Sequence, residues 1–422
     1  MLYSAIKGRI DRSVTEGDIF MDFKTLLQQL KDKAVWGKII IFALPLVIIL
    51  LLVLTSIDTS DKSKDSPPIN NGHNGDHIHD IDLDTAMTFF PPDTIMMSAG
   101  DASITWAEFY VFLHNAVSQL SYNFMIELDW EEEFFDNKTV AESILEYTTD
   151  HALELLVFEY ASTVLGVSLG QEDFDIIQED IDYMLADAES LEALEEGLHE
   201  NGFLSLEVYR TLRLREFIPW LLLSSLYGDD LSDISDDTVA EFAEFHKYMR
   251  AQHILLAFLR AEDGHSAQEI EDNKIELRAQ IDNILDRLNE RAGDNDFFDF
   301  FEELMWEYGE DPGMFSSPDG YLFQPNDMVA PFSEACAAIL PGQLSDVVTT
   351  SYGYHIILRL PINYDEIPFS MIYAGYNYSL RMLAIIDDFE NRMEAWRESM
   401  NVVFSPEYYS INLSEMFLWD EH

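Results

Sequence analysis

The chain has 422 residues, of which 79 are acidic and 24 are basic, so its net charge at neutral pH is −55. Nucleic-acid binding needs a basic surface, and a charge of this sign and size argues against a nucleic-acid partner. The single cysteine, Cys336, excludes an intrachain disulfide and also excludes Cys-x-x-Cys metal or redox sites. The length exceeds that of one typical domain, and a hydrophobic content of 48% is sufficient for more than one core.

The first predicted element is an uncharged apolar run, IIIFALPLVIILLLVL, at residues 39–54. With its flanks it gives a segment, 36–57, that is long enough to cross a bilayer as a helix. Basic residues are concentrated before it, in 1–35, and acidic residues follow it. The positive-inside rule therefore predicts a cytoplasmic segment 1–35, a single-pass signal anchor 36–57 in the cell membrane, and an extracytoplasmic remainder. A cleaved signal peptide is the rival interpretation, but the segment before the apolar run is long and no A-x-A site follows it.

The next segments differ from each other in composition and periodicity. Residues 58–92 are rich in Asp, Ser, Asn, Gly and Pro, which is typical of a flexible linker, here an acidic one. Two short strand-like runs and then helical hydrophobic spacing follow in 93–247, which predicts a mainly helical domain. Another helix is predicted at 377–399, and its apolar stripe needs a surface to pack on. We therefore expect the C-terminal segment 363–422 to be helical and to pack on the helical region 93–247.

The stretch 248–362 combines strand-like runs with helical segments, in the order strand, helices, strand pair, which predicts a compact α+β domain. Its first strand-like run contains His253 and its last contains His355, each followed by aliphatic residues. A buried imidazole is costly unless its nitrogens find polar partners. The sequence therefore raises the question of what these two histidines contact.

Three motifs within this stretch, taken together, resemble the parvulin family of peptidyl-prolyl isomerases. The first is AQHIL at 251–255, and the second is MVAPFSEA at 328–335. The third is GQLSDVV at 342–348, followed by GYHII at 353–357. The preceding helical region is similar to the chaperone region of membrane-anchored, extracytoplasmic foldases of the PrsA and SurA type.

The resemblance implies a parvulin domain with a small sheet and surrounding helices, which catalyses the cis–trans isomerisation of X–Pro bonds. The catalytic residues that it implies are His253, Asp311, Tyr352 and His355. The two histidines would lie side by side on adjacent central strands and hydrogen-bond to each other. The substrate-binding residues that it implies, around the proline ring, are Met328, Phe332, Leu322 and Phe323. Because the reaction breaks no bond and needs no nucleophile, we expect no cofactor and no metal.

Each of these residues also has a purely structural interpretation. The two histidines could be a mutually satisfied core pair, and Asp311 could serve the turn that its Asp-Pro-Gly sequence favours. Met328 and Phe332 could be core residues at helical spacing. Two functions therefore stay open: an active isomerase and foldase, or a holdase chaperone with a weak or inactive parvulin domain. Either would act on unfolded or partly folded exported polypeptides that contain X–Pro bonds.

Overall fold

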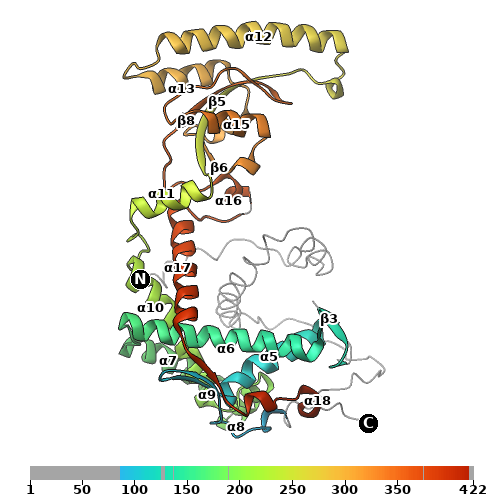
Figure 1. Ribbon diagram of the computed structural model, residues 1–422, viewed down its shortest axis with the longest axis vertical. Helices are drawn as coiled ribbons and strands as arrows, with labels where there is room; N and C mark the ends of the chain where they lie inside the picture. Colours follow the sequence, from blue (N-terminus) through green and yellow to red (C-terminus); the bar gives the residue numbers. More distant parts are fainter. Residues whose placement is uncertain (1–85, 125–128, 136, 189, 374, 418–422) are drawn as a thin grey trace.

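The computed structural model describes residues 86–124, 129–135, 137–188, 190–373 and 375–417 (Figure 1). They form a mainly helical domain and a smaller α+β domain, and the long helix α17 (Leu380–Ser399) runs from one to the other. The predicted cytoplasmic segment 1–35 and anchor 36–57, with most of the linker 58–92, lie outside the described residues. Within the described ranges, no helix is both long and apolar enough to cross a membrane.

The helical domain contains a three-stranded sheet made from the two ends of the described chain. The hairpin of β1 (Ile95–Ala99) and β2 (Ala102–Thr105) leads directly into α5 (Trp106–Phe124). The strand β9 (Val402–Phe404) pairs antiparallel with the free edge of β1, so that Met97 lies opposite Phe404. The sequence predicts β1 and β2 but not β9, because three residues with little alternation carry almost no strand signal. The sequence predicts a helical C-terminal segment 363–422. The structure corrects this prediction, because the segment also contributes a strand to this sheet.

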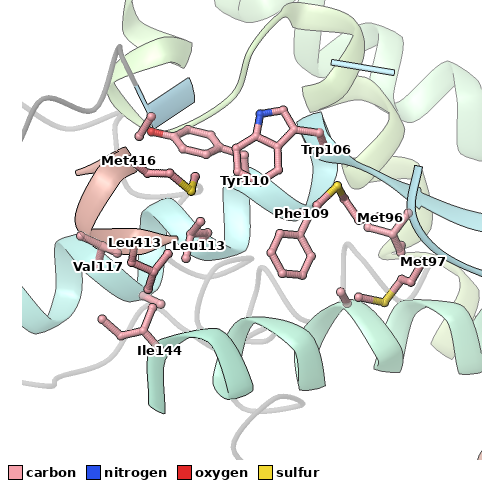
Figure 2. Packing of buried hydrophobic residues seen from close by; sticks show 14 of the residues in the cluster. Met96, Met97, Trp106, Phe109, Tyr110, Leu113, Val117, Ile144, Leu413 and Met416 are labelled. Atoms are coloured by element: carbon pink, nitrogen blue, oxygen red, sulfur yellow. The ribbon is translucent and has the colours of Figure 1, made fainter. Parts of the chain in front are cut away.

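The rest of the helical domain packs around the hairpin and α5. Figure 2 shows its core, in which aromatic side chains of α5 meet methionines of β1 and residues of the C-terminal α18 (Leu413–Met416). The other elements are β3 (Glu133–Phe135), β4 (Lys138–Thr139), α6 (Val140–Leu165), α7 (Gln171–Asp187), α8 (Leu191–Glu200), α9 (Leu206–Arg215), α10 (Ile218–Tyr227), α11 (Asp236–Phe245) and the short η3 (Tyr408–Ser410).

The α+β domain is built on a four-stranded antiparallel sheet with the strand order β6-β5-β8-β7. Its central pair, β5 (Met249–Ala257) and β8 (Gly353–Leu360), is in register from Arg250 opposite Leu360 to Ala257 opposite Gly353. The edge strands are β6 (Tyr321–Phe323) and β7 (Val348–Thr349). The remaining elements are η1 (Ala261–Asp263), α12 (Ala267–Glu290), α13 (Phe297–Tyr308), α14 (Pro312–Ser316), η2 (Pro325–Asp327), α15 (Ala330–Ala338) and α16 (Phe369–Tyr373).

The helix α17 contacts both domains with different parts of its length. Near its start, Leu380 and Ala384 pack in one cluster with Val239 of α11 and with Leu322 of β6, which belongs to the α+β domain. Further along, its apolar side chains join a core cluster with residues of α6 and α10, namely Ile385 and Phe389 with Phe158, Ala161 and Leu222. The α+β domain is thus inserted between two segments of the helical domain, and the chain connects it at both ends.

Candidate active site

The two histidines lie on the same face of the sheet, on its two central strands. In the β5–β8 register, His355 is opposite Leu255 and His253 is opposite Ile357, so the histidines are diagonal neighbours. Their ring centroids are 5.2 Å apart and the ring planes are inclined by 84°. Both side chains are buried. The placement that the resemblance implies, side by side on adjacent central strands, is what the structure has.

The hydrogen bond between the two histidines, however, is not formed, and each ring has its own partner. His355 Nε2 is 2.8 Å from the hydroxyl oxygen of Thr350. His253 Nε2 is 2.9 Å from Oδ2 of Asp311, close enough for a hydrogen bond. The edge-to-face packing of the two rings explains this arrangement, because it directs the edge of one ring at the face of the other.

The carboxylate of Asp311 accepts two hydrogen bonds and lies close to one imidazole nitrogen. Its Oδ1 accepts from the backbone N–H of Gly313 at 3.0 Å, and its Oδ2 accepts from the hydroxyl of Tyr321 at 3.0 Å. His253 approaches the same Oδ2. Partial burial alone would raise the pKa of Asp311, but these contacts, led by that with His253, outweigh it and hold the pKa below its usual value. Asp311 also caps α14, so the turn interpretation and the site interpretation both apply to it.

Two residues of this network are missing from the sequence-based site. Tyr321 reaches Asp311 from β6, and Thr350 reaches His355 from the loop before β8. The Tyr321 hydroxyl fits because residue 313 is glycine: a Cβ at Gly313 would lie only 1.8 Å from the hydroxyl oxygen. A signal for Thr350 was present in the third motif, where it stands between DVV and GYHII. No comparable signal marks Tyr321, whose role depends on the placement of an edge strand.

The predicted proline-binding residues divide between the two faces of the sheet. The Phe332 ring lies 5.1 Å from the His253 ring and 5.6 Å from the His355 ring, centroid to centroid. Phe323 packs on Phe332 at 5.8 Å, and Met328 packs half-buried against the same cluster. Leu322 instead belongs to the cluster with α11 and α17 on the opposite side. Leu322 therefore does not join the apolar group at the histidines.

The predicted catalytic Tyr352 is also placed differently from the other residues. Its side chain is 48% exposed, and its ring lies 5.9 Å from the guanidinium carbon of Arg260 at the surface. Only its backbone joins the network, because its N–H donates to the Thr350 hydroxyl at 3.0 Å. The structure thus brings together His253, His355 and Asp311, but not the Tyr352 ring.

Comparison with known sequences agrees with this geometry. Residues 239–359 match the PPIC-type PPIase domain family, and the matched range contains both histidines and Asp311. The α+β domain, which makes up most of this range, is a parvulin domain of the PPIC type.

Relatives of the chain extend the comparison beyond the parvulin domain. The chain is 30% identical over 146 residues to foldase protein PrsA of Geobacillus kaustophilus, which is 34% of this chain and 43% of the relative. It is 29% identical over 148 residues to foldase protein PrsA of Bacillus subtilis, which is 35% and 42% of the two chains. It is also 30% identical over 105 residues to chaperone SurA of Burkholderia thailandensis, which is 25% and 20%. The chain spans less than half the length of each of these curated relatives.

The buried His355 gives the parvulin domain a predicted pH dependence. Burial, assisted by the nearby His253, lowers the pKa of His355 to about 3, whereas an unfolded histidine titrates near 6.5. As the pH falls below about 6.5, the unfolded chain gains a proton that the folded domain does not accept. The stability that the neutral His355 contributes is therefore complete above pH 6.5. It is lost as the pH falls toward 3, by at most about 1.4 kcal/mol of unfolding free energy per pH unit.

The measurement is the hydrogen exchange of β8 amides in the whole chain at several pH values from 7.5 to 4.5. We expect the loss of stability with falling pH to be smaller in His355→Asn than in the wild type. The exposed His199 on α8 provides the control, because His199→Gln should leave the slope unchanged. Equal slopes in the wild type and in His355→Asn would show that His355 does not set this dependence.

Proposed function

We propose that the chain is a peptidyl-prolyl cis–trans isomerase and a foldase for exported polypeptides. The observation that supports this most directly is the arrangement of His253, His355 and Asp311 beside Phe332 in the PPIC-type domain. The relatives named foldase PrsA and chaperone SurA support the foldase part of the proposal. The substrates would be unfolded or partly folded chains with X–Pro bonds.

The proposed reaction needs a site that binds the twisted X–Pro bond better than the planar one. Amide resonance sets a barrier of about 18–20 kcal/mol, and each tenfold gain in rate requires about 1.4 kcal/mol of preferential binding. In the twisted state the bond loses its charge separation, so an apolar wall is favourable to it. Phe332 and Met328 would supply this wall for the proline ring, and His253 with the ionised Asp311 would face the polar atoms of the bond.

The location that we propose depends on the N-terminal sequence. The apolar segment 36–57, with basic residues before it, supports a single-pass anchor with its N-terminus in the cytoplasm. Both described domains would then act outside the membrane, where newly exported chains pass. Insertion of the parvulin domain between two segments of the helical domain would keep isomerisation close to the surfaces that hold an unfolded client.

Met328 gives the most direct test of the proposed proline pocket. It is half-buried at the edge of the cluster, so Met328→Ala should reduce kcat/KM on a short X–Pro peptide by roughly tenfold, through lost apolar contact, without unfolding the domain. Leu340→Ala is the matched control, because Leu340 is 66% exposed beyond the end of α15. If Met328→Ala turns over the peptide as fast as Leu340→Ala, Met328 does not belong to the pocket.

A holdase function is the second candidate, and the burial of Phe332 favours it. Only 3% of Phe332 is exposed, and its ring packs on both histidines, so the floor of the pocket is closed in this structure. The two functions separate when peptide turnover is measured beside the suppression of aggregation of an unfolded protein. Suppression of aggregation without turnover supports the holdase, whereas turnover that falls in Met328→Ala supports the isomerase.

A further inference from the structure

A cleft of about 660 Å³ opens beside the edge strand β6, next to the parvulin site. One wall is the loop before β6 with Tyr321, and the other wall is the segment 363–372, which leads from β8 to α17. Its volume lies within the range of about 300–1,000 Å³ that is usual for ligand sites. The cleft is thus large enough for one or two side chains of a bound peptide.

The lining of the cleft combines apolar groups with an excess of negative charge. Phe369 and Ile372 of α16 supply the apolar part, and Ile372 is 55% exposed. The charged residues that line it are Arg250, Asp319, Asp365 and Glu366. The Nε of Arg250 lies 2.5 Å from a carboxylate oxygen of Glu366, and Asp365 is paired with Arg381 at 2.8 Å. Among the described residues, Asp319 is the lining carboxylate that has no ion pair, so it supplies the negative charge that a bound group can contact. An incoming group therefore meets a net negative, partly apolar surface.

Tyr321 connects the cleft to the histidines. Its ring centroid is 6.0 Å from that of His253 on one side and 5.2 Å from that of Phe369 on the other. An extended peptide advances by about 3.3 Å per residue, so three or four residues bridge the two places. A chain whose proline lies at Phe332 can therefore reach the cleft with a side chain a few residues away.

We propose that this cleft is an accessory subsite for the client polypeptide. It binds a basic or apolar side chain three or four residues from the proline that is isomerised, and this assignment rests on the proposed isomerase function. The charge of the lining selects lysine or arginine over acidic residues, since like charges repel in a partly buried setting. The exposed Ile372 accounts for the apolar part of the preference.

The test compares peptides that share one X–Pro core. A four-residue peptide reaches only the histidines. Two longer peptides carry a Lys-Leu pair at the third and fourth positions from the proline, one peptide before the proline and the other after it. Two further peptides carry Glu-Ser at the same positions. We expect one of the Lys-Leu peptides to have a KM about fivefold below that of its Glu-Ser counterpart. Ile372→Ala and Asp319→Lys should remove most of this difference and leave kcat/KM on the four-residue peptide unchanged.

The matched controls lie on α12, which is at the opposite end of the α+β domain from β6 and α16 (Figure 1), the elements that border the cleft. Ile275 is 63% exposed and Glu271 is also exposed, so Ile275→Ala and Glu271→Lys repeat the two changes elsewhere on the surface. They should leave the Lys-Leu preference intact. The proposal is overturned if neither Lys-Leu peptide is preferred, or if the cleft variants change the preference no more than the α12 variants do.

A separate binding measurement keeps the cleft distinct from the isomerase proposal. If the full chain turns over no peptide, the isomerase function fails, but fluorescence anisotropy of labelled Lys-Leu and Glu-Ser peptides still reports on the cleft. Tighter binding of a Lys-Leu peptide that is lost in Ile372→Ala and Asp319→Lys supports the subsite. Equal binding of both peptides by the wild type overturns it.

Discussion

Asp311→Ala is expected to destabilise the parvulin domain by about 3 kcal/mol and to remove most of the isomerase activity that we propose for it. The substitution removes the acceptor of two hydrogen bonds, from the Tyr321 hydroxyl and the Gly313 backbone, and the carboxylate that lies 2.9 Å from Nε2 of His253. A buried polar group that loses its partner costs about 1–3 kcal/mol. We expect a total of about 3 kcal/mol, and not the sum of several such penalties, because Asp311 is only half-buried and water can replace part of the lost contacts.

Asp319→Ala provides the matched control for this change. Asp319 is an exposed aspartate in the same loop region, and its replacement should shift the free energy of unfolding by no more than about 0.5 kcal/mol. Asp311→Asn keeps the shape but loses the charge, so it should fall between the wild type and Asp311→Ala. The measurements are urea unfolding of the whole chain and turnover of a short X–Pro peptide. Wild-type stability in Asp311→Ala would contradict the stabilising role of the contacts around Asp311.

The candidate site was predictable from the sequence to the extent that its chemistry is tied to short motifs. His253 and His355 stand in apolar runs that mark them as unusual. Met328 and Phe332 have helical spacing in the sequence, but α15 begins at Ala330, so Met328 lies before the helix in an extended conformation and only Phe332 is on it. The contact partners of the two imidazoles were not predictable in the same way. The sequence resemblance implies a bond between them, whereas the structure gives each ring an oxygen partner from a loop.

The pair Leu322 and Phe323 shows a prediction that the geometry of a strand argues against. Neighbouring residues of a strand point to opposite faces of a sheet, so both cannot line one pocket from β6. Phe323 and Tyr321 face the histidine side, and Leu322 faces α11 and α17. The missing information was that residues 321–323 form a strand, since a run this short has no clear periodicity.

The C-terminal part of the fold was the least predictable, because its contacts join residues far apart in the chain. The strand β9 completes a sheet whose other two strands lie before α5, and Phe417 packs on Trp130 with ring centroids 5.7 Å apart. Local sequence patterns contain no information on such pairing, and only the burial of the whole core selects it. The segment after α17 therefore looks like a tail in the sequence but is a structural part of the helical domain.

This arrangement leads to the second large effect that we expect. In the double variant Leu413→Ala, Met416→Ala, the helical domain should lose most of its stability while the parvulin domain stays folded. Both side chains are almost fully buried in the core, close to Leu113 and Val117 of α5 (Figure 2). Each substitution of a buried leucine or methionine by alanine costs about 2–5 kcal/mol, and the total stability of a domain is typically about 5–15 kcal/mol.

Hydrogen exchange of the full chain separates the two domains in this experiment. Amides of α5 should lose protection in the double variant, and amides of β5 and β8 should keep it, because the core around the parvulin sheet does not include the C-terminal residues. Glu415→Ala is the control on the same short helix, since Glu415 is exposed and its removal should change little. Retained protection of α5 would show that the packing of α18 on α5 is dispensable. Loss of protection in both domains would instead show that α17 couples their stabilities, since it packs against each of them.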